Sequence, residues 1–440
     1  MPERSSQFEL TLAKSTDLER MLAIHAAAFP GARSVAERRA NFLDNPRGGA
    51  SDLFVVRVRS AAREATDSSA LREGDVVGHA FLFRMHMWIA GKSVPVGGVA
   101  SIGVASEARG RGVGRTIVEG LVAESSRRGD ALQLLYPFAQ RFYAGFGFGP
   151  TAPVLRLRVA ASALPHRELA SMCVRVSPTS PSARASMLLC YGAAARRACG
   201  HLDRSDVLLG KMLALDGTFT FLVPGRGGQD AAARGYVSFS FVSQHQTGTT
   251  ELDVRELVAN DDEARRALIG VLAAHRDQVS AVELSVDLGD PLPLVVTEAH
   301  APGAPFVPQH LHPIGAIGAG PLVRVIDPAA ALRSRGYFHD GELDLRLTDG
   351  AARACGDASL RLTVRDGVGL VAPSPAASLA VADAGEVLAL DVATLSAIVV
   401  GALRPSDAAR HSLVRASDEA LACADRIFDT RAPFRCLDEF

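Results

Sequence analysis

Residues 96–150 constrain the fold of this chain more than any other stretch of its sequence. An apolar, glycine-interrupted run at residues 96–104 has the pattern of a buried strand, and the loop RGRGVGR at residues 109–115 follows it. Beyond the loop, apolar residues recur four apart on one face of an amphipathic helix: Val113, Ile117 and Leu121 in one series, Val118 and Val122 in another. The sequence therefore predicts a strand, a tight loop and a helix that packs by one face on the sheet.

The loop between this strand and this helix has the chemistry of an anion-binding site. Gly110, Gly112 and Gly114 carry no side chains, so the backbone there can approach a ligand closely. The first N–H groups of a helix have no partners within the helix and lie at the positive end of its dipole. A glycine-rich loop that opens a helix therefore predicts a cradle for a pyrophosphate group.

The spacing of the loop distinguishes between families that use such cradles. A nucleotide-triphosphate loop requires Lys and then Ser or Thr after its last glycine, but Val113 and Gly114 stand there. The dinucleotide fingerprint fails as well, because Arg115 replaces its third glycine. The pattern R-x-x-G-x-G, at Arg109, Gly112 and Gly114, resembles motif A of the GNAT superfamily of N-acetyltransferases. This resemblance implies that the loop holds the pyrophosphate of coenzyme A.

Two features further along support the same resemblance. Residues 131–135 read as a second apolar strand, and residues 143–148, YAGFGF, resemble the Y-x-x-F-G-F segment of the superfamily. By the resemblance, the first strand pairs with the pantetheine amides, and two residues past the second strand contact the arm near the acetyl group. The implied coenzyme-binding residues are Ile102, Gly103, Val104, Arg109, Gly110, Arg111, Gly112, Val113, Gly114, Arg115, Phe138 and Ala139.

Two helices are predicted near the N-terminus. Residues 16–19 and residues 34–37 both have the form of a capping box, with Thr16 or Ser34 at the N-cap and Glu three residues later. In acetyltransferases of this type, the joint between these helices overhangs the acceptor site. Together with the flanking strands, they complete a first domain that we expect to span residues 1–153.

A chain of 440 residues is long enough for two or three domains. Residues 154–300 repeat the strand and helix order of the first domain, but Asn260, Asp261 and Asp262 replace the glycine loop, and carboxylates repel a pyrophosphate. Residues 301–440 combine apolar helices with strands joined at an Asp366–Gly367 turn, which resembles a sterol-carrier-type fold. The predicted class is therefore α+β (α/β): tandem GNAT acetyltransferase domains, the second degenerate, and then a sterol-carrier-like domain. We expect this last domain to act as a scaffold rather than as a lipid carrier.

This domain order resembles the enhanced intracellular survival (Eis) family of aminoglycoside acetyltransferases. The resemblance implies acetyl transfer from acetyl-CoA to primary amines of a polycationic small molecule such as an aminoglycoside. It implies Tyr143 as general acid and the carboxylate of the last residue, Phe440, as general base. It also implies a homohexamer built as a dimer of trimers.

Elementary chemistry supports both roles. An aliphatic ammonium group has a pKa near ~10, so a carboxylate is needed to accept its proton, and a phenol can protonate the departing thiolate. The tail at residues 432–437 is apolar and contains a proline, unlike a frayed end. The alternatives are that Tyr143 is a core aromatic residue and that the carboxylate of Phe440 is exposed and inactive.

Alternative functions and excluded partners follow from the rest of the sequence. The acceptor can instead be a protein lysine or a polyamine, or the chain can be a lipid-carrying or regulatory protein with a vestigial acetyltransferase domain. A net charge of -1 argues against nucleic acid, and the lack of a long apolar run argues against membranes and for the cytoplasm. The six cysteines lack zinc-site spacing, and His310 and His312 lack acidic or cysteine neighbours, so no metal is expected.

Overall fold

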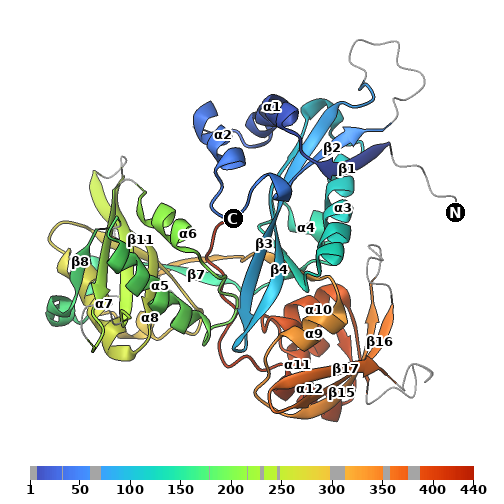
Figure 1. Ribbon diagram of the computed structural model, residues 1–440. Helices are drawn as coiled ribbons and strands as arrows, with labels where there is room; N and C mark the ends of the chain where they lie inside the picture. The colour runs from blue at the N-terminus through green and yellow to red at the C-terminus, as the bar shows by residue number, and fades with distance from the viewer. Residues whose placement is uncertain are drawn as a thin grey trace. The chain divides into compact units, whose positions relative to one another are not determined.

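The computed structural model describes residues 7–31, 33–59, 71–177, 179–215, 217–227, 232–244, 248–297, 313–349, 357–374 and 387–440. The chain divides into two compact units (Figure 1). One unit joins Met1–Thr151 to Pro321–Phe440, and the other is Ala152–Gly320. The boundary expected at residues 300/301 and the histidines at 310 and 312 lie outside the described residues.

The first unit is built around a seven-stranded sheet of order β1-β2-β3-β4-β5-β14-β6. Its elements are β1 (Phe8–Leu12), α1 (Leu18–Ala28), α2 (Val35–Leu43), β2 (Leu53–Val58), β3 (Val76–Ile89), β4 (Lys92–Val104), α3 (Val113–Arg128), β5 (Leu132–Leu135), α4 (Gln140–Ala144), β6 (Gly149–Pro150) and β14 (Leu322–Val325). The predicted strand, helix and second strand are confirmed as β4, α3 and β5. Val113, Ile117, Val118, Leu121 and Val122 are buried, as the helical spacing predicted.

Strand β14 was not predicted. It comes from the C-terminal part of the chain and lies antiparallel between β5 and β6, with Leu322 opposite both Leu135 and Pro150. Helix α10 (Val392–Val399) of the C-terminal domain packs on β14 and β6. The first and the C-terminal domain therefore share one continuous sheet.

The two predicted helix caps have different outcomes. At α2, the Ser34 hydroxyl accepts a hydrogen bond from Glu37 N at 3.2 Å, and the Glu37 carboxylate accepts one from Ser34 N at 2.6 Å, which confirms the capping box. The box at residues 16–19 is wrong. Asp17 instead accepts from Lys14 N at 2.7 Å and from Arg57 at 2.6 Å, so a 3-10 turn at Ser15–Asp17 precedes α1.

The second unit repeats the arrangement of the first domain. Its sheet has the order β13-β7-β12-β11-β10-β9-β8. The elements are β7 (Val154–Ala160), β8 (Val174–Val176), α5 (Pro181–Ala195), α6 (Asp206–Leu213), β9 (Thr218–Val223), β10 (Gly235–Gln244), β11 (Thr249–Ala259), α7 (Asp262–Ala274), β12 (Ala281–Val286), α8 (Leu292–Val295) and β13 (Gly315–Gly318). Strand β11 runs antiparallel to β10 and parallel to β12. In the first domain, β4 likewise runs antiparallel to β3 and parallel to β5.

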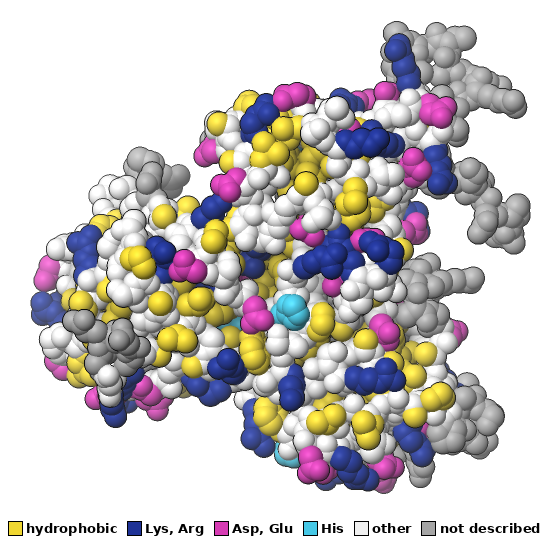
Figure 2. Space-filling model, in the orientation of Figure 1, with side chains coloured by type: hydrophobic (Ala, Val, Ile, Leu, Met, Phe, Trp, Pro, Cys, Tyr) yellow, Lys and Arg dark blue, Asp and Glu magenta, His cyan; other side chains and the backbone are white. Residues whose placement is uncertain are grey.

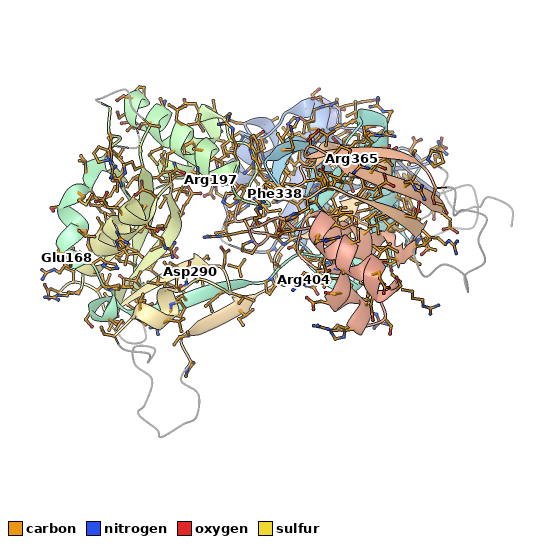
Figure 3. All side chains as sticks on the ribbon, turned by 90° about the horizontal axis from the view of Figure 1, so that it is seen from below. Glu168, Arg197, Asp290, Phe338, Arg365 and Arg404 are labelled. Carbon is orange, nitrogen blue, oxygen red and sulfur yellow. The ribbon has the colours of Figure 1, made fainter. Side chains whose placement is uncertain are left out.

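The C-terminal domain adds a five-stranded sheet of order β17-β16-β15-β18-β19. Its elements are α9 (Pro328–Ser334), β15 (Gly341–Thr348), β16 (Ala358–Arg365), β17 (Val368–Pro373), β18 (Val387–Asp391), α10, α11 (Pro405–Arg410), β19 (Val414–Arg415) and α12 (Asp418–Ile427). Asp366 and Gly367 have φ of 51° and 75°, which confirms the predicted hairpin turn. Arg365 and Arg404, labelled in Figure 3, pair with Glu342 and Asp425 at 3.1 Å each. Among the described helices, none has the length and apolar character needed to span a membrane.

Candidate active site

The two central strands of the first sheet separate part-way along their length. Strands β4 and β5 pair in parallel only from Val96–Leu132 to Val99–Leu135. Because β5 ends at Leu135 and β4 continues to Val104, no strand among the described residues pairs with this edge of β4 beyond Val99. The backbone of residues 100–104 is therefore available to an extended ligand, which can bind as an added strand does.

A β-bulge bends β4 at the same point. In the pairing with β3, His79 faces Gly103 and Phe81 faces Ala100, so one residue of β3 faces two of β4. Ser101 lies inside the bulge with φ of 49°, a left-handed conformation that is uncommon for a residue with a side chain. Gly103 lies two residues further along, and a Cβ added there would lie 2.5 Å from the buried ring of His79. Ile102 and Val104, two of the predicted coenzyme residues, thus lie on the unpaired edge next to the bulge.

The loop before α3 leaves the helix N-terminus open. Gly112 is the N-cap with φ of 93°, no side chain caps the helix, and Gly110 also has positive φ, at 74°. A Cβ added at either glycine would meet nothing within 4 Å. This open backbone fits a pyrophosphate group, since the N–H groups of the first turn point to where an anion would bind.

The three arginines of the loop differ in their contacts. Arg115 pairs with Glu119 at 2.9 Å and lies over the ring of Phe146, and Arg109 donates to the carbonyl of Ala27 at 3.5 Å. Arg111 is exposed and has no polar partner among the described residues. Arg111 is therefore the arginine whose charge is most readily available to a phosphate.

The corresponding position in the second unit is occupied by the protein's own carboxylates. Asp261 caps α7 by accepting from Ala264 N at 2.9 Å, and Arg234 holds Asp261 at 2.6 Å. Arg234 also contacts Glu263 at 2.6 Å. The N-terminus of α7 is thus capped by the protein's own acidic side chains, which agrees with the prediction that this second domain is degenerate.

Tyr143 lies in α4 with its side chain enclosed by aromatic rings. The centroids of the rings of Phe138, Phe142 and Phe148 lie 5.5, 5.0 and 5.9 Å from that of Tyr143. The residue is 2% exposed, and burial raises the pKa of its phenol to about 12. No group among the described residues hydrogen-bonds to its hydroxyl. The phenol therefore stays protonated at neutral pH and can donate that proton to a ligand. Phe138 itself is 76% exposed, and Ala139 precedes α4 as its N-cap.

The C-terminal tail is docked on the first domain. The ring of Phe440 lies against Tyr136, with centroids 5.4 Å apart, and a Cβ added at Gly98 of β4 would lie 3.3 Å from the Phe440 ring. Arg47, just after α2, donates to the carbonyl of Glu439 at 2.8 Å. Figure 1 marks this end of the chain close to α2 and β3. The last residue is therefore held at the point where β4 and β5 begin to separate.

Two residues that anchor the tail were missed in the sequence. Arg47 also forms an ion pair with Asp438 at 3.1 Å, in which the side chains are only 5% and 3% exposed. The Tyr136 hydroxyl lies within hydrogen-bond distance of the carbonyls of Cys436 and Asp438, at 3.2 and 3.1 Å. Burial raises the pKa of Tyr136, and the neighbouring Cys436 and Asp438 raise it further, so it remains a donor. A tyrosine directly after the predicted second strand was the only signal of this contact.

The segment after β5 connects the two proposed catalytic residues. Tyr136 contacts Phe440, and two residues later Phe138 contacts Tyr143. The glycine loop also lies next to α4, because a Cβ added at Gly114 would be 3.3 Å from the ring of Phe142. The segment at residues 136–143 is therefore in contact with Phe440 at one end and with the start of α3 at the other.

Comparisons with known domain families agree with this geometry. Residues 9–151 and residues 211–324 match two family models that are both described as an acetyltransferase (GNAT) domain. Residues 328–435 match a sterol carrier protein domain. The domain content is that of an N-acetyltransferase. These matches confirm the predicted class of two GNAT domains followed by a sterol-carrier-like domain, and acetyl-CoA is the co-substrate that GNAT domains use.

Solved structures share the fold over nearly the whole chain. A GCN5-related N-acetyltransferase from Anabaena variabilis has a TM-score of 0.79 at 20% identity, with 97% of this chain and 98% of that one covered. One from Kribbella flavida has a TM-score of 0.74 at 24% identity, with 100% of each chain covered. Eis1 from Mycobacterium abscessus has a TM-score of 0.74 at 21% identity, with 98% of this chain and 100% of that one covered. None of the curated proteins compared with the chain matches it. At these identities the N-acetyltransferase shares its fold with the three structures, and its acceptor has to be argued from its own residues.

Proposed function

We propose that the protein transfers the acetyl group of acetyl-CoA to a primary amine of a polycationic small molecule, such as an aminoglycoside. The observation that carries the proposal is the C-terminal tail, which Arg47 and Tyr136 anchor at the β4–β5 opening. A free carboxylate at this point suits a reaction in which an ammonium group must lose a proton. The same charge attracts a cationic acceptor.

The coenzyme is proposed to bind along β4 and the start of α3. Its pantetheine amides pair with the free backbone edge at Ile102 and Val104. Its pyrophosphate lies on the N–H groups of residues 110–115, with Arg111 supplying a charge-assisted bond. Phe138 and Ala139 then contact the arm near the thioester, next to Tyr143.

The proposed reaction uses one residue for each proton. The α-carboxylate of Phe440 takes a proton from the acceptor ammonium, directly or through a water molecule. The free amine attacks the thioester carbonyl carbon, so that a C–N bond forms and the C–S bond breaks. Tyr143 donates its phenolic proton to the departing thiolate. The products are an N-acetylated amine and coenzyme A.

A protein lysine is the second candidate acceptor, and exposed apolar side chains favour it. Phe29, Val35 and Leu43, on the segment that covers the acceptor side in this type of domain, are 41%, 66% and 65% exposed. Hydrophobic side chains gather over α1 and α2 in Figure 2. A polycation needs unpaired carboxylates instead, and of the acidic groups in the described tail at residues 438–440, Asp438 is already paired with Arg47.

A screen of acceptors tests the proposal. The purified chain is incubated with acetyl-CoA and with aminoglycosides, polyamines or lysine peptides, and release of the thiol is measured. We expect the highest kcat/KM with an aminoglycoside. A preference for a lysine peptide would favour the second candidate, and no thiol release with any amine would contradict an acetyltransferase of amines.

Substitution of Gly112 tests the coenzyme site alone. Gly112→Asp places a Cβ on a backbone with φ of 93° and a negative charge at the proposed pyrophosphate position. We expect the Kd for coenzyme A to rise on the order of tenfold or more, measured by calorimetry. Gly129→Asp is the matched control, because Gly129 also has positive φ, at 79°, but lies at the other end of α3. Unchanged affinity in Gly112→Asp would exclude the loop as the binding site.

We also propose a cytoplasmic homohexamer, a dimer of trimers, without nucleic-acid or membrane partners. The sterol-carrier-like domain would serve as its scaffold. The described cysteines are all free, which suits a reducing compartment. Sedimentation at micromolar protein is expected to give about six times the mass of the chain, and a monomer there would contradict the assembly.

A further inference from the structure

Arg324 is a buried charge in the strand that the C-terminal part of the chain adds to the first sheet. Its Nη2 lies 3.0 and 3.3 Å from the two carboxylate oxygens of Asp349, and the two side chains are 0% and 1% exposed. Arg324 belongs to β14, and Asp349 directly follows β15 of the C-terminal sheet. The ion pair therefore joins the first domain's sheet to the C-terminal domain in a site that excludes water.

The other arm of the guanidinium holds the segment that contains Tyr143. Arg324 Nη1 donates to the carbonyl of Phe146. The carbonyl of Tyr143 in turn accepts from Phe146 N at 2.9 Å and from Phe148 N at 3.4 Å. Arg324 therefore binds the residue, Phe146, whose N–H group holds the backbone of Tyr143.

The absence of a side chain at Gly147 leaves room for this guanidinium group. Gly147 has φ of 78°, and a Cβ added there would overlap Arg324 Nη1. The glycine in the F-G-F segment therefore leaves space for the arginine as well as allowing the turn. The planar fork of the guanidinium matches this arrangement, because one arm binds the Phe146 carbonyl and the other binds the Asp349 carboxylate.

Stability alone gives little reason to bury such a pair. A buried ion pair is often no more stabilising than apolar residues of similar volume, but it imposes a specific geometry. We propose that Arg324, held by Asp349, is a positioning residue that fixes the orientation of Tyr143 for proton donation. This inference rests on the proposed function, since it assigns Arg324 an effect that passes through the phenol. The C-terminal domain then contributes to both proton transfers, through the base at Phe440 and through the alignment of the acid.

The test is a double-mutant cycle on kcat. Arg324→Lys keeps the positive charge but loses the planar fork of donors that holds Phe146 and Asp349 in a fixed geometry. We expect kcat to fall about tenfold with the Kd for coenzyme A unchanged, because only alignment of the acid is lost. In the Tyr143→Phe background, the same substitution is expected to change kcat by less than about twofold, since residues that act as a unit are not additive. Asp349→Asn is the second variant and is expected to follow the same pattern.

A buried arginine in the second unit is the matched control. Arg204 pairs with Glu256 at 2.7 Å, with side chains 3% and 15% exposed, and Arg204→Lys is expected to lower the thermal midpoint without changing kcat. A full tenfold effect of Arg324→Lys in the Tyr143→Phe background would overturn the proposal, and so would a change confined to the thermal midpoint. If Tyr143→Phe alone leaves kcat unchanged, the proposed acid fails instead, which separates the two outcomes.

Discussion

A Gly-Ser extension after Phe440 is expected to lower kcat by about 10²–10⁴-fold, which is the range for loss of a general base. The extension removes no side chain. It converts the α-carboxylate into an amide and moves the new terminus by about 3.3–3.6 Å for each added residue, beyond hydrogen-bond reach. The ring of Phe440 can keep its contact with Tyr136, and the Arg47–Asp438 pair precedes the change. Affinity for coenzyme A and the thermal midpoint are therefore expected to remain near those of the native chain.

Two companion variants separate lost chemistry from lost docking. Phe440→Ala keeps the carboxylate but loses the ring contact, so we expect a smaller loss of kcat than from the extension. The same Gly-Ser extension placed before Met1 is the control for an added tail and is expected to have no effect. Steady-state thiol release is compared across the three proteins, and coenzyme affinity is measured for each. Equal kcat with and without the C-terminal extension would remove Phe440 from the mechanism.

The anchored tail also explains how a chain terminus can take a fixed position. Chain ends are usually mobile, because few contacts hold them. Here Arg47 binds the carbonyl of Glu439 and the carboxylate of Asp438, while Tyr136 contacts the preceding carbonyls. The Arg47–Asp438 pair is almost completely enclosed, so solvent screens it far less than a surface pair. These contacts hold residues 438–440 against the first domain.

The parts of the fold that depend on local sequence were predictable. Glycine spacing and apolar periodicity located the loop, α3 and β4, because each of these features depends on residues that are close together in the sequence. The Asp366–Gly367 turn was likewise correct, since two consecutive positive φ angles favour this pair of residues. The box at residues 16–19 was wrong because Asp17 binds Arg57, which is distant in sequence, so a local pattern could not indicate it.

The parts that depend on distant partners were not predictable. The insertion of β14 between β5 and β6 pairs Leu322 with residues far earlier in the chain, and nothing in a four-residue strand specifies that register. The bulge at Ser101 arises from the pairing with β3, so the alternation of β4 alone does not reveal it. Arg324 did leave a signal, namely one arginine within the apolar run at residues 322–326. A charge inside a buried strand predicts a partner, although it does not name Asp349.

Tyr143→Phe is expected to lower kcat by about 10²-fold or more while the fold and the coenzyme affinity persist. The substitution keeps the ring contacts with Phe138, Phe142 and Phe148 and removes only the hydroxyl. That hydroxyl has no hydrogen-bond partner among the described residues, so its loss leaves no buried group unsatisfied. Because burial raises the phenol's pKa to about 12, the native residue is protonated throughout the neutral range, as the proposed donation to the thiolate requires.

A buried tyrosine of the second unit, Tyr191, is a control whose substitution should affect stability but not turnover. The Tyr191 hydroxyl donates to the carbonyl of Leu202 at 2.7 Å, so Tyr191→Phe leaves a buried acceptor unpaired and is expected to cost about 1–3 kcal/mol of unfolding free energy. It is expected to leave kcat unchanged. The two variants should therefore separate: Tyr143→Phe loses turnover without stability, and Tyr191→Phe loses stability without turnover. Thiol release and thermal unfolding of both proteins measure this directly. Native kcat in Tyr143→Phe would make Tyr143 a core aromatic residue, and protonation of the leaving thiolate would then have to come from solvent.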